Sequence, residues 1–222
     1  MNLIERISRN IDDFRKDTLN VDHFLTGTLV SYMFFKDKYP DILNEFNEKD
    51  RDVEEKRGME IFKNLNLEIS SYETEIYTFC FINLIARTEA FLNDILDTHY
   101  LLINQETTEE NNELLRKTIL KFSHSSFNDK IKFLKNNFNL DFPSIEEHKP
   151  NIIELFSTRN IILHNNGYVN ETYLKINENS QFVLGTKRII DRDYLKLTIL
   201  LLVLIAKSIE EKTKELIKNS SH

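Results

Sequence analysis

The residues best suited to chemistry are concentrated in one short stretch, FSTRNIILHNNGYV, at residues 156–169. It contains an arginine, an asparagine and a histidine: Arg159, Asn160 and His164. An arginine carries a permanent planar charge that grips phosphate oxygens in a bidentate manner. A histidine moves protons near neutral pH, and an asparagine amide holds either group through hydrogen bonds. Together these residue types suit a reaction at a phosphate.

A helix would bring these side chains toward one region. Residues of an α-helix advance by about 100° each, so Asn160 and His164 lie about 40° apart on one face. Arg159 lies about 140° from His164, but its side chain is long and flexible. The aliphatic residues between them turn toward the core. The Asn-Asn-Gly that follows predicts the end of this helix, because Asn and Gly tolerate positive φ.

Two interpretations of the trio follow from residue types and spacing, and both stay open at this point. Without a metal, these groups suffice to drive the 2′-hydroxyl of RNA onto the adjacent phosphate, giving a 2′,3′-cyclic phosphate and a free 5′-hydroxyl. The alternative is structural. Arginine and asparagine near a helix end bond exposed carbonyls, and a protonated histidine there interacts favourably with the helix dipole.

The stretch STRNIILHNNGYV resembles the R-x4-6-H signature of HEPN domains, with Arg159, four residues and then His164. The polar Asn160 directly after the arginine fits the common form of that signature. An upstream long helix carrying RTEAFLNDIL and the downstream pattern G-x-x-x-x-x-D-x-x-Y-L, from Gly185 to Leu195, match its context. The resemblance covers roughly residues 70–218. It is nearest to HEPN proteins of bacterial defence and abortive-infection systems, including the RiboL-PSP-HEPN group.

This resemblance implies an all-α bundle that forms a homodimer, with the two motif helices meeting in one composite cleft. Many HEPN proteins are metal-independent endoribonucleases that act as toxins or phage-defence effectors, so the expected substrate is RNA. An antitoxin or another defence-system protein is a further expected partner. Toxins paired with nucleotidyltransferase antitoxins usually have a tyrosine two residues after the histidine. Asn166 stands there instead, which argues against that subgroup.

Residue roles follow from the same resemblance. Arg159 would stabilise charge on the phosphate, His164 would transfer the proton, and Asn160 would position one or both. Glu89, on the upstream long helix, would orient Arg159, or it would be an ordinary exposed helix residue. Asn165 would contact the substrate or cap the helix. A second hypothesis makes the chain a non-catalytic helical module that binds a nucleotide or a protein.

Composition supports an all-α fold and limits the functional classes. The 222 residues include four glycines and three prolines, which disfavours turn-rich β folds and glycine-rich phosphate loops. The net charge of −7 argues against a broad basic surface for long nucleic acids. The single Cys80 excludes an intrachain disulfide, and the scattered histidines lack metal-ligand spacing, so we predict neither metal nor cofactor.

The longest apolar run, ILLLVLIA at residues 199–206, is far shorter than the roughly 20 residues that cross a bilayer. We therefore expect a cytoplasmic protein without a membrane contact. Hydrophobic periodicity predicts an N-terminal helical extension at 1–68, with breaks near Pro40 and Gly58, and a helical domain at 69–222. The resemblance implies that this second domain is HEPN-like. The helices expected in the second part span about 71–103, 110–121, 125–137, 143–165 with a kink at Pro150, and 192–218, with a small β-hairpin at 172–190.

Overall fold

The computed structural model describes residues 3–47, 53–103 and 109–220. These residues form eight α-helices and no β-strand, so the predicted all-α class is confirmed for the described part of the chain. The helices are α1 (Leu3–Asn47), α2 (Val53–Ile103), α3 (Glu109–Ser123), α4 (Phe127–Phe138), α5 (Pro143–Glu147), α6 (Lys149–Asn165), α7 (Glu171–Ile176) and α8 (Arg192–Ser220).

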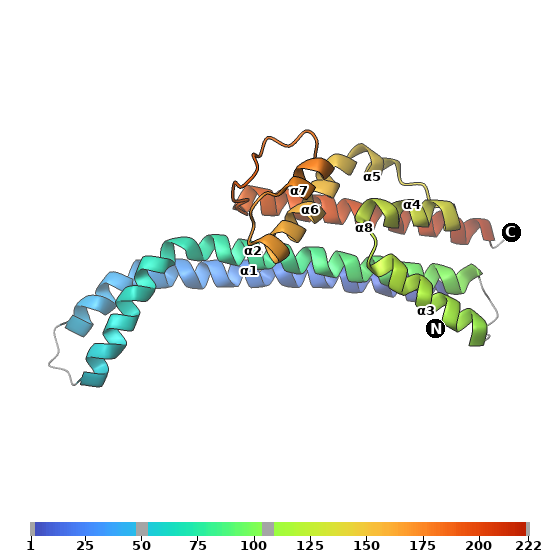
Figure 1. The fold of residues 1–222 in the computed structure, drawn as a ribbon. Coiled ribbons are helices and arrows are strands. Elements are labelled where there is room, and N and C mark those ends of the chain that lie inside the picture. The colour runs from blue at the N-terminus through green and yellow to red at the C-terminus, as the bar shows by residue number, and fades with distance from the viewer. Residues whose placement is uncertain (1–2, 48–52, 104–108, 221–222) are drawn as a thin grey trace.

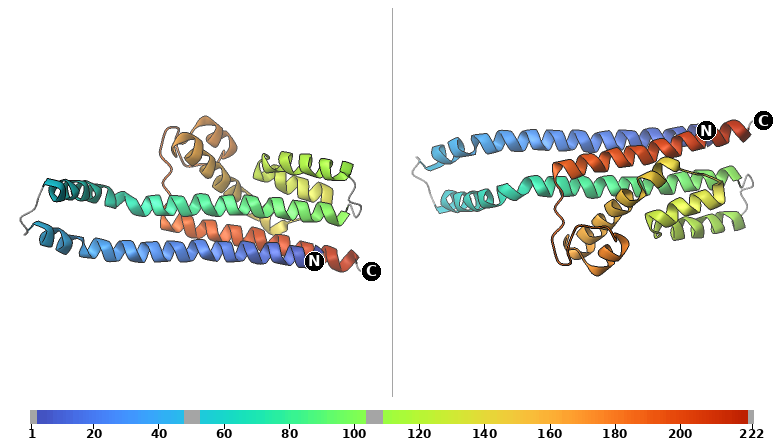
Figure 2. Two further views of the ribbon diagram at one scale, coloured as in Figure 1. Left: turned by 90° about the horizontal axis from the view of Figure 1, so that it is seen from below. Right: turned by 90° about the horizontal axis from the view of Figure 1, so that it is seen from above.

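Helices α1 and α2 form a long antiparallel pair, and α8 lies alongside both of them (Figure 1 and Figure 2). Helices α3, α4, α6 and α7 lie on the α2 side of these three helices, away from α1, whereas α5 packs against α8 (Figure 2). The joined ends of α1 and α2 extend past the other helices. Helix α6 packs against α2, so the stretch that carries Arg159 lies beside the central helix of the fold.

The larger apolar cluster contains residues from α1, α2, α3, α4, α5, α6 and α8. Phe14 of α1 stacks on Phe91 of α2 with a centroid distance of 4.6 Å. Leu202 and Ile205 of α8 are fully buried in the same cluster. Burial of large apolar side chains is the main stabilising contribution to a fold of this kind, so the first turns of α1 belong to the core that also supports α6.

The predicted breaks at Pro40 and Gly58 are wrong, because α1 continues to Asn47 and α2 begins at Val53. A proline inside a helix removes one hydrogen bond and bends the helix without having to end it. A glycine costs about 1 kcal/mol, which a long helix tolerates. Both helices bend toward their joined ends (Figure 1). Helix α2 passes through residue 68 without interruption, and the functional division of the chain at that position stays a prediction.

The predicted β-hairpin at 172–190 is also wrong. Residues Glu171–Ile176 form α7, whose first turn is capped by Asn170: its Oδ1 accepts a hydrogen bond of 2.8 Å from the Tyr173 amide. The remaining residues form loops, with one isolated antiparallel bridge between Tyr168 and Lys187. The alternation of apolar residues was compatible with a strand, but the capping asparagine favours a helical turn.

The expected end of the 143–165 helix at Asn165 is confirmed, but the single kinked helix is wrong, because the segment is divided at His148 into α5 and α6. Pro150 does not kink a helix but lies in the first turn of α6, where its missing N–H is not needed. At the other end Asn166 and Gly167 adopt φ values of 52° and 79°. The Gly167 amide donates a hydrogen bond of 3.0 Å to the Ile161 carbonyl, which closes the helix.

Side chains also cap the first turns of α4 and α8. Ser126 caps α4 by accepting a hydrogen bond of 3.2 Å from the Asp129 amide, and Asp191 caps α8 by accepting one of 2.8 Å from the Tyr194 amide. Among the described residues, no helix combines the length and the hydropathy that crossing a bilayer requires.

Candidate functional site

The buried face of α6 determines where Arg159 lies. Ile152, Leu155 and Phe156 are buried on this face, and Phe156 stacks on Phe127 of α4 with a centroid distance of 4.7 Å. Arg159 follows Phe156 by three residues, so it continues the same face by one turn. Its side chain therefore lies at the junction of α6 with α2 and α4 rather than in open solvent.

Arg159 is held by two described partners. Its Nη2 lies 3.4 Å from Oε2 of Glu89, and these two side chains are only 24% and 28% exposed. Its Nη1 donates a hydrogen bond of 3.1 Å to Oδ1 of Asn160. The Glu89 side chain therefore lies where the sequence hypothesis placed it, although its part in any reaction is still a prediction. The Arg159 Nε is buried and has no hydrogen-bond partner among the described residues.

His164 lies apart from this ion pair. Asn160 and His164 are both exposed, one turn apart on α6. Leu163 beside them is 46% exposed, so the expectation that the aliphatic residues between Asn160 and His164 turn toward the core is wrong for Leu163. No hydrogen bond or ion pair joins the His164 imidazole to any residue that the structure describes. The structure thus brings Arg159, Asn160 and Glu89 together, while His164 faces solvent at the end of the helix.

Asn165 has a structural contact. Its Nδ2 donates a hydrogen bond of 2.7 Å to the Tyr168 carbonyl, across the turn that ends α6. The capping interpretation of this residue is therefore the one that the observed geometry supports.

Lys130 of α4 is a charged neighbour of the motif that the sequence analysis missed. Its side chain is only 1% exposed, and its Nζ lies 5.4 Å from the centroid of the Phe122 ring. Burial lowers the pKa of the Lys130 ammonium, the nearby Glu89 carboxylate opposes this effect, and the Arg159 guanidinium adds to it. Lys130 is therefore electrostatically coupled to both members of the ion pair.

A sequence signal for Lys130 does exist. The helix residues Phe127, Ile131 and Leu134 form an apolar face, and Lys130 occupies a position on that same face. A lysine is rarely fully buried without a partner, so a lysine at a core position of such a pattern indicates a charged group with a specific role.

A second polar cluster surrounds Glu154, five residues before Arg159. Its carboxylate accepts hydrogen bonds from the hydroxyls of Thr158, Tyr173 and Tyr194, and from Nε of Arg188 at 3.4 Å. Burial is the main cause that raises the pKa of Tyr173 to about 12, and burial likewise raises the pKa of Tyr194. The cluster joins α6, α7, the following loop and α8, so it fixes the first half of α6.

A pocket of about 630 Å³ lies beside this cluster. It is lined by the first turn of α6, by α7 with its following loop, and by the start of α8. The Arg188 guanidinium lies between the rings of Phe182 and Tyr194, 4.5 Å and 4.0 Å from their centroids. Because Arg188 and Glu154 already form an ion pair with each other, the main role of the cluster is to hold the surrounding helices together.

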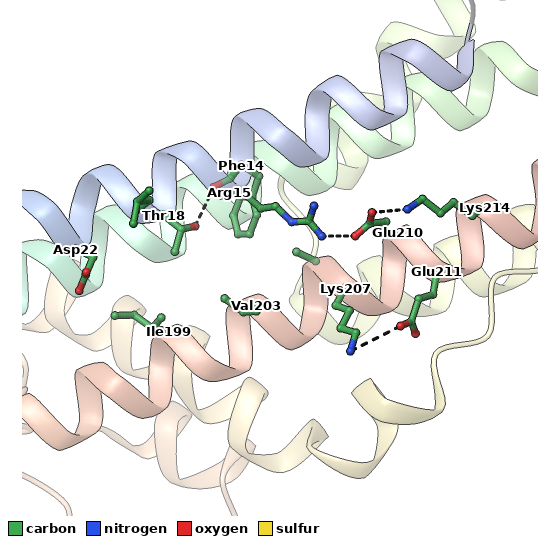
Figure 3. Close-up of a pocket in the computed structure, with 12 residues that line it drawn as sticks. Phe14, Arg15, Thr18, Asp22, Ile199, Val203, Lys207, Glu210, Glu211 and Lys214 are labelled. Atoms are coloured by element: carbon green, nitrogen blue, oxygen red, sulfur yellow. Dashed lines mark hydrogen bonds and ion pairs between the residues drawn. The ribbon is translucent and has the colours of Figure 1, made fainter.

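A groove of about 480 Å³ between α1 and α8 has a different character (Figure 3). Its floor is apolar, with Val203 and Ile199 of α8 facing Phe14. At its rim Glu210 pairs with Arg15 of α1 and with Lys214, whose hydrogen bond is the main cause that lowers the Glu210 pKa. These cross-helix contacts hold α1 against α8.

No family model, curated protein or solved structure matches this chain. Within the described ranges, no group of three or more His, Cys, Asp or Glu side chains is arranged to hold a metal ion. A functional assignment must therefore come from the residues themselves and from their arrangement around α6.

Proposed function

We propose that the chain is a HEPN-type endoribonuclease that acts in the cytoplasm as a homodimer, as a toxin or a phage-defence effector. RNA would be its substrate, and the reaction would need no metal. The resemblance of the Arg159–His164 stretch to the HEPN signature motivates this proposal, and the all-α fold is compatible with it.

One observation carries the proposal. The guanidinium of Arg159 is held by Glu89 on α2 and reaches the Asn160 side chain at 3.1 Å, while Asn160 and His164 stay exposed one turn apart. A phosphate that approaches the end of α6 would thus meet a held cation, an amide and an imidazole from one helix. An arginine that only capped the helix would bond terminal carbonyls instead.

The reaction would be an intramolecular transesterification. The ribose 2′-oxygen forms a bond to the phosphorus, and the bond between phosphorus and the 5′-oxygen breaks. One proton leaves the 2′-hydroxyl and one is delivered to the departing 5′-oxygen, both of which suit histidine. Arg159 would stabilise the charge that develops on the non-bridging oxygens, and Asn160 would orient the phosphate or the imidazole.

A dimer would supply the second proton-transfer group. In the proposed composite cleft, His164 of one copy takes the proton and His164 of the other copy donates one. The exposed Leu163 beside His164 offers apolar surface for such a contact between two α6 helices.

The decisive experiment is RNA cleavage in the presence of EDTA by the wild type and by His164→Ala, with equal thermal stability verified first. We expect products with cyclic phosphate ends from the wild type and none from the variant. His23→Ala, at an exposed site on α1, serves as the matched control and should keep full activity. Equal cleavage by His164→Ala, or a strict monomer in sedimentation at all concentrations, would contradict the proposal.

The second candidate is a non-catalytic binding module, and the pocket beside Glu154 favours it. A pocket of about 630 Å³ is within the range of small-molecule sites. This candidate predicts no cleavage by the wild type on tRNA or mRNA and saturable binding of a nucleotide. Substitution of Tyr173 or Phe182 should weaken that binding, whereas His164→Ala should not.

A further inference from the structure

Lys130 is a buried cation that the fold alone does not explain. Its side chain is 1% exposed, and its Nζ makes no hydrogen bond to any described residue. Its Nζ lies over the ring of Phe122, 5.4 Å from the ring centroid. Removing an ammonium group from water without a hydrogen-bonding partner is strongly unfavourable, and one aromatic face offsets only part of that cost.

The packing of α4 on α6 places Lys130 near the motif. Phe127 and Phe156 stack with their centroids 4.7 Å apart, and Lys130 and Arg159 each follow their stacked ring by three residues. The charges of Glu89 and Arg159 both act on Lys130. The Arg159 Nε is likewise buried without a described partner. Glu89 is thus paired with Arg159 alone while its charge also acts on Lys130, and both cations keep unused hydrogen-bond donors.

The charge of this group points to the ligand. Lys130 and Arg159 as cations and Glu89 as an anion leave one positive charge in a partly desolvated site. A monoanion would neutralise it, and the phosphodiester of an RNA backbone is a monoanion. A phosphate at Arg159 would compete with Glu89 for the guanidinium, because both are acceptors for the same N–H groups.

We propose, on the basis of the ribonuclease function proposed above, that Lys130 is a positioning residue. It becomes the ion-pair partner of Glu89 when Arg159 binds an RNA phosphodiester. The carboxylate then keeps a cationic partner, and Arg159 is free to direct its N–H groups at the phosphate. Without Lys130, a phosphate at Arg159 would leave Glu89 as an unpaired, partly buried anion.

This role makes the binding of RNA depend on the charge of Lys130. The charges of Glu89 on α2 and Arg159 on α6 act on Lys130, and the Phe122 ring of α3 lies over its Nζ. Burial moves the pKa of Lys130 below its ordinary value, so its charge is lost at a lower pH than for an exposed lysine. RNA affinity should therefore decline as the pH rises through the lowered Lys130 pKa.

The test measures binding of a fluorescein-labelled 2′-O-methyl oligoribonucleotide by fluorescence anisotropy. This probe keeps the phosphodiesters but lacks the attacking hydroxyl, so binding is separated from cleavage. We expect Lys130→Met to weaken binding by about tenfold or more, whereas Lys132→Met, at an exposed site on the same helix, should change it by less than about twofold. Lys130→Arg should restore binding, because a guanidinium keeps the charge.

A pH series keeps the test informative if Lys130→Met does not fold. Between about pH 7 and about pH 10, wild-type affinity should fall, and the affinity of Lys130→Arg, which does not titrate there, should fall less. Identical pH profiles of these two proteins, or equal binding by folded Lys130→Met and Lys132→Met, would overturn the role of Lys130 and leave the ribonuclease proposal intact. A wild type that neither binds the probe nor cleaves RNA would overturn both.

Discussion

Nη2 of Arg159 lies 3.4 Å from Oε2 of Glu89, so an ion pair joins the motif helix α6 to the central helix α2. The two residues are 70 positions apart in the chain, and neither side chain is more than 28% exposed. The pair therefore fixes the direction of the one arginine to which the proposed chemistry assigns the phosphate.

Glu89→Gln should lower RNA cleavage more than it lowers stability. The amide keeps the shape of the side chain but removes its charge, so Arg159 loses orientation while the fold keeps its packing. We expect a cleavage rate reduced about tenfold, equivalent to about 1.4 kcal/mol, and an unfolding free energy changed by about 1 kcal/mol. Initial rates and denaturant titrations measure the two effects. Glu146→Gln removes a comparable ion pair, with Lys149, and an equal loss of rate in this control would contradict the prediction.

Glu154→Ala should destabilise the fold strongly. The substitution leaves two buried tyrosine hydroxyls, of Tyr173 and Tyr194, and the Arg188 guanidinium without their shared acceptor. Breaking a network of this kind costs about 3–5 kcal/mol. Urea unfolding followed by circular dichroism measures it. Tyr173→Phe, which removes one hydroxyl from the network, should cost only about 1 kcal/mol, and equal losses in both variants would count against a shared network.

His99 should make the protein sensitive to mild acid. Its imidazole is 2% exposed; Nδ1 donates a hydrogen bond of 2.9 Å to the Ile95 carbonyl, and Nε2 lies 3.3 Å from the Thr213 hydroxyl. Burial lowers the pKa of His99 from its ordinary value of 6.5. Below that pH the unfolded chain binds a proton that the folded protein resists, so the unfolding free energy should fall as the pH drops.

The measurement for His99 is the unfolding free energy between about pH 7 and about pH 5. The decline should be smaller in His99→Gln, which retains a donor for the Ile95 carbonyl and does not titrate. His23→Gln, at an exposed position on α1, is the matched control and should decline like the wild type. A wild-type slope unchanged in His99→Gln would show that other groups cause the acid sensitivity.

Phe14→Ala tests whether α1 belongs to the cooperative core. The ring is 5% exposed and stacks on Phe91 at 4.6 Å. Removal of the ring should lower the unfolding free energy by about 3–5 kcal/mol, and unfolding should remain a single transition. The control Phe24→Ala removes a ring on the same helix that is 51% exposed and should cost much less. A separate early transition for α1 would instead support an independent N-terminal extension.

Local signals predicted much of the fold. The end of the helix that carries Arg159 was identified correctly, because it depends on Asn166 and Gly167 and on the positive φ that their backbone tolerates. The breaks predicted at Pro40 and Gly58 were wrong, because a long helix can tolerate the local free-energy cost of one proline or glycine. Which side chains meet across helices was harder to infer. The Glu89 contact was a hypothesis among alternatives, and the Glu154 cluster depends on residues brought together by α7 and α8.

Lys130 illustrates why the candidate site was only partly predictable. Its position on the apolar face of α4 was visible in the sequence, but its proximity to Arg159 follows from the Phe127–Phe156 stack between two helices. Spacing along one helix can place Arg159 and His164 relative to each other. It does not predict which other helix, here α4, packs beside them.

The attachments of α6 at both ends have an entropic consequence. Glu154 fastens the first half of the helix to α7 and α8, and the Asn165 and Gly167 hydrogen bonds close its last turn. The segment between them is already ordered before any ligand arrives. A molecule that binds the exposed face of α6 would therefore lose its own freedom on association but would not have to order the protein backbone, which favours tight and geometrically selective recognition.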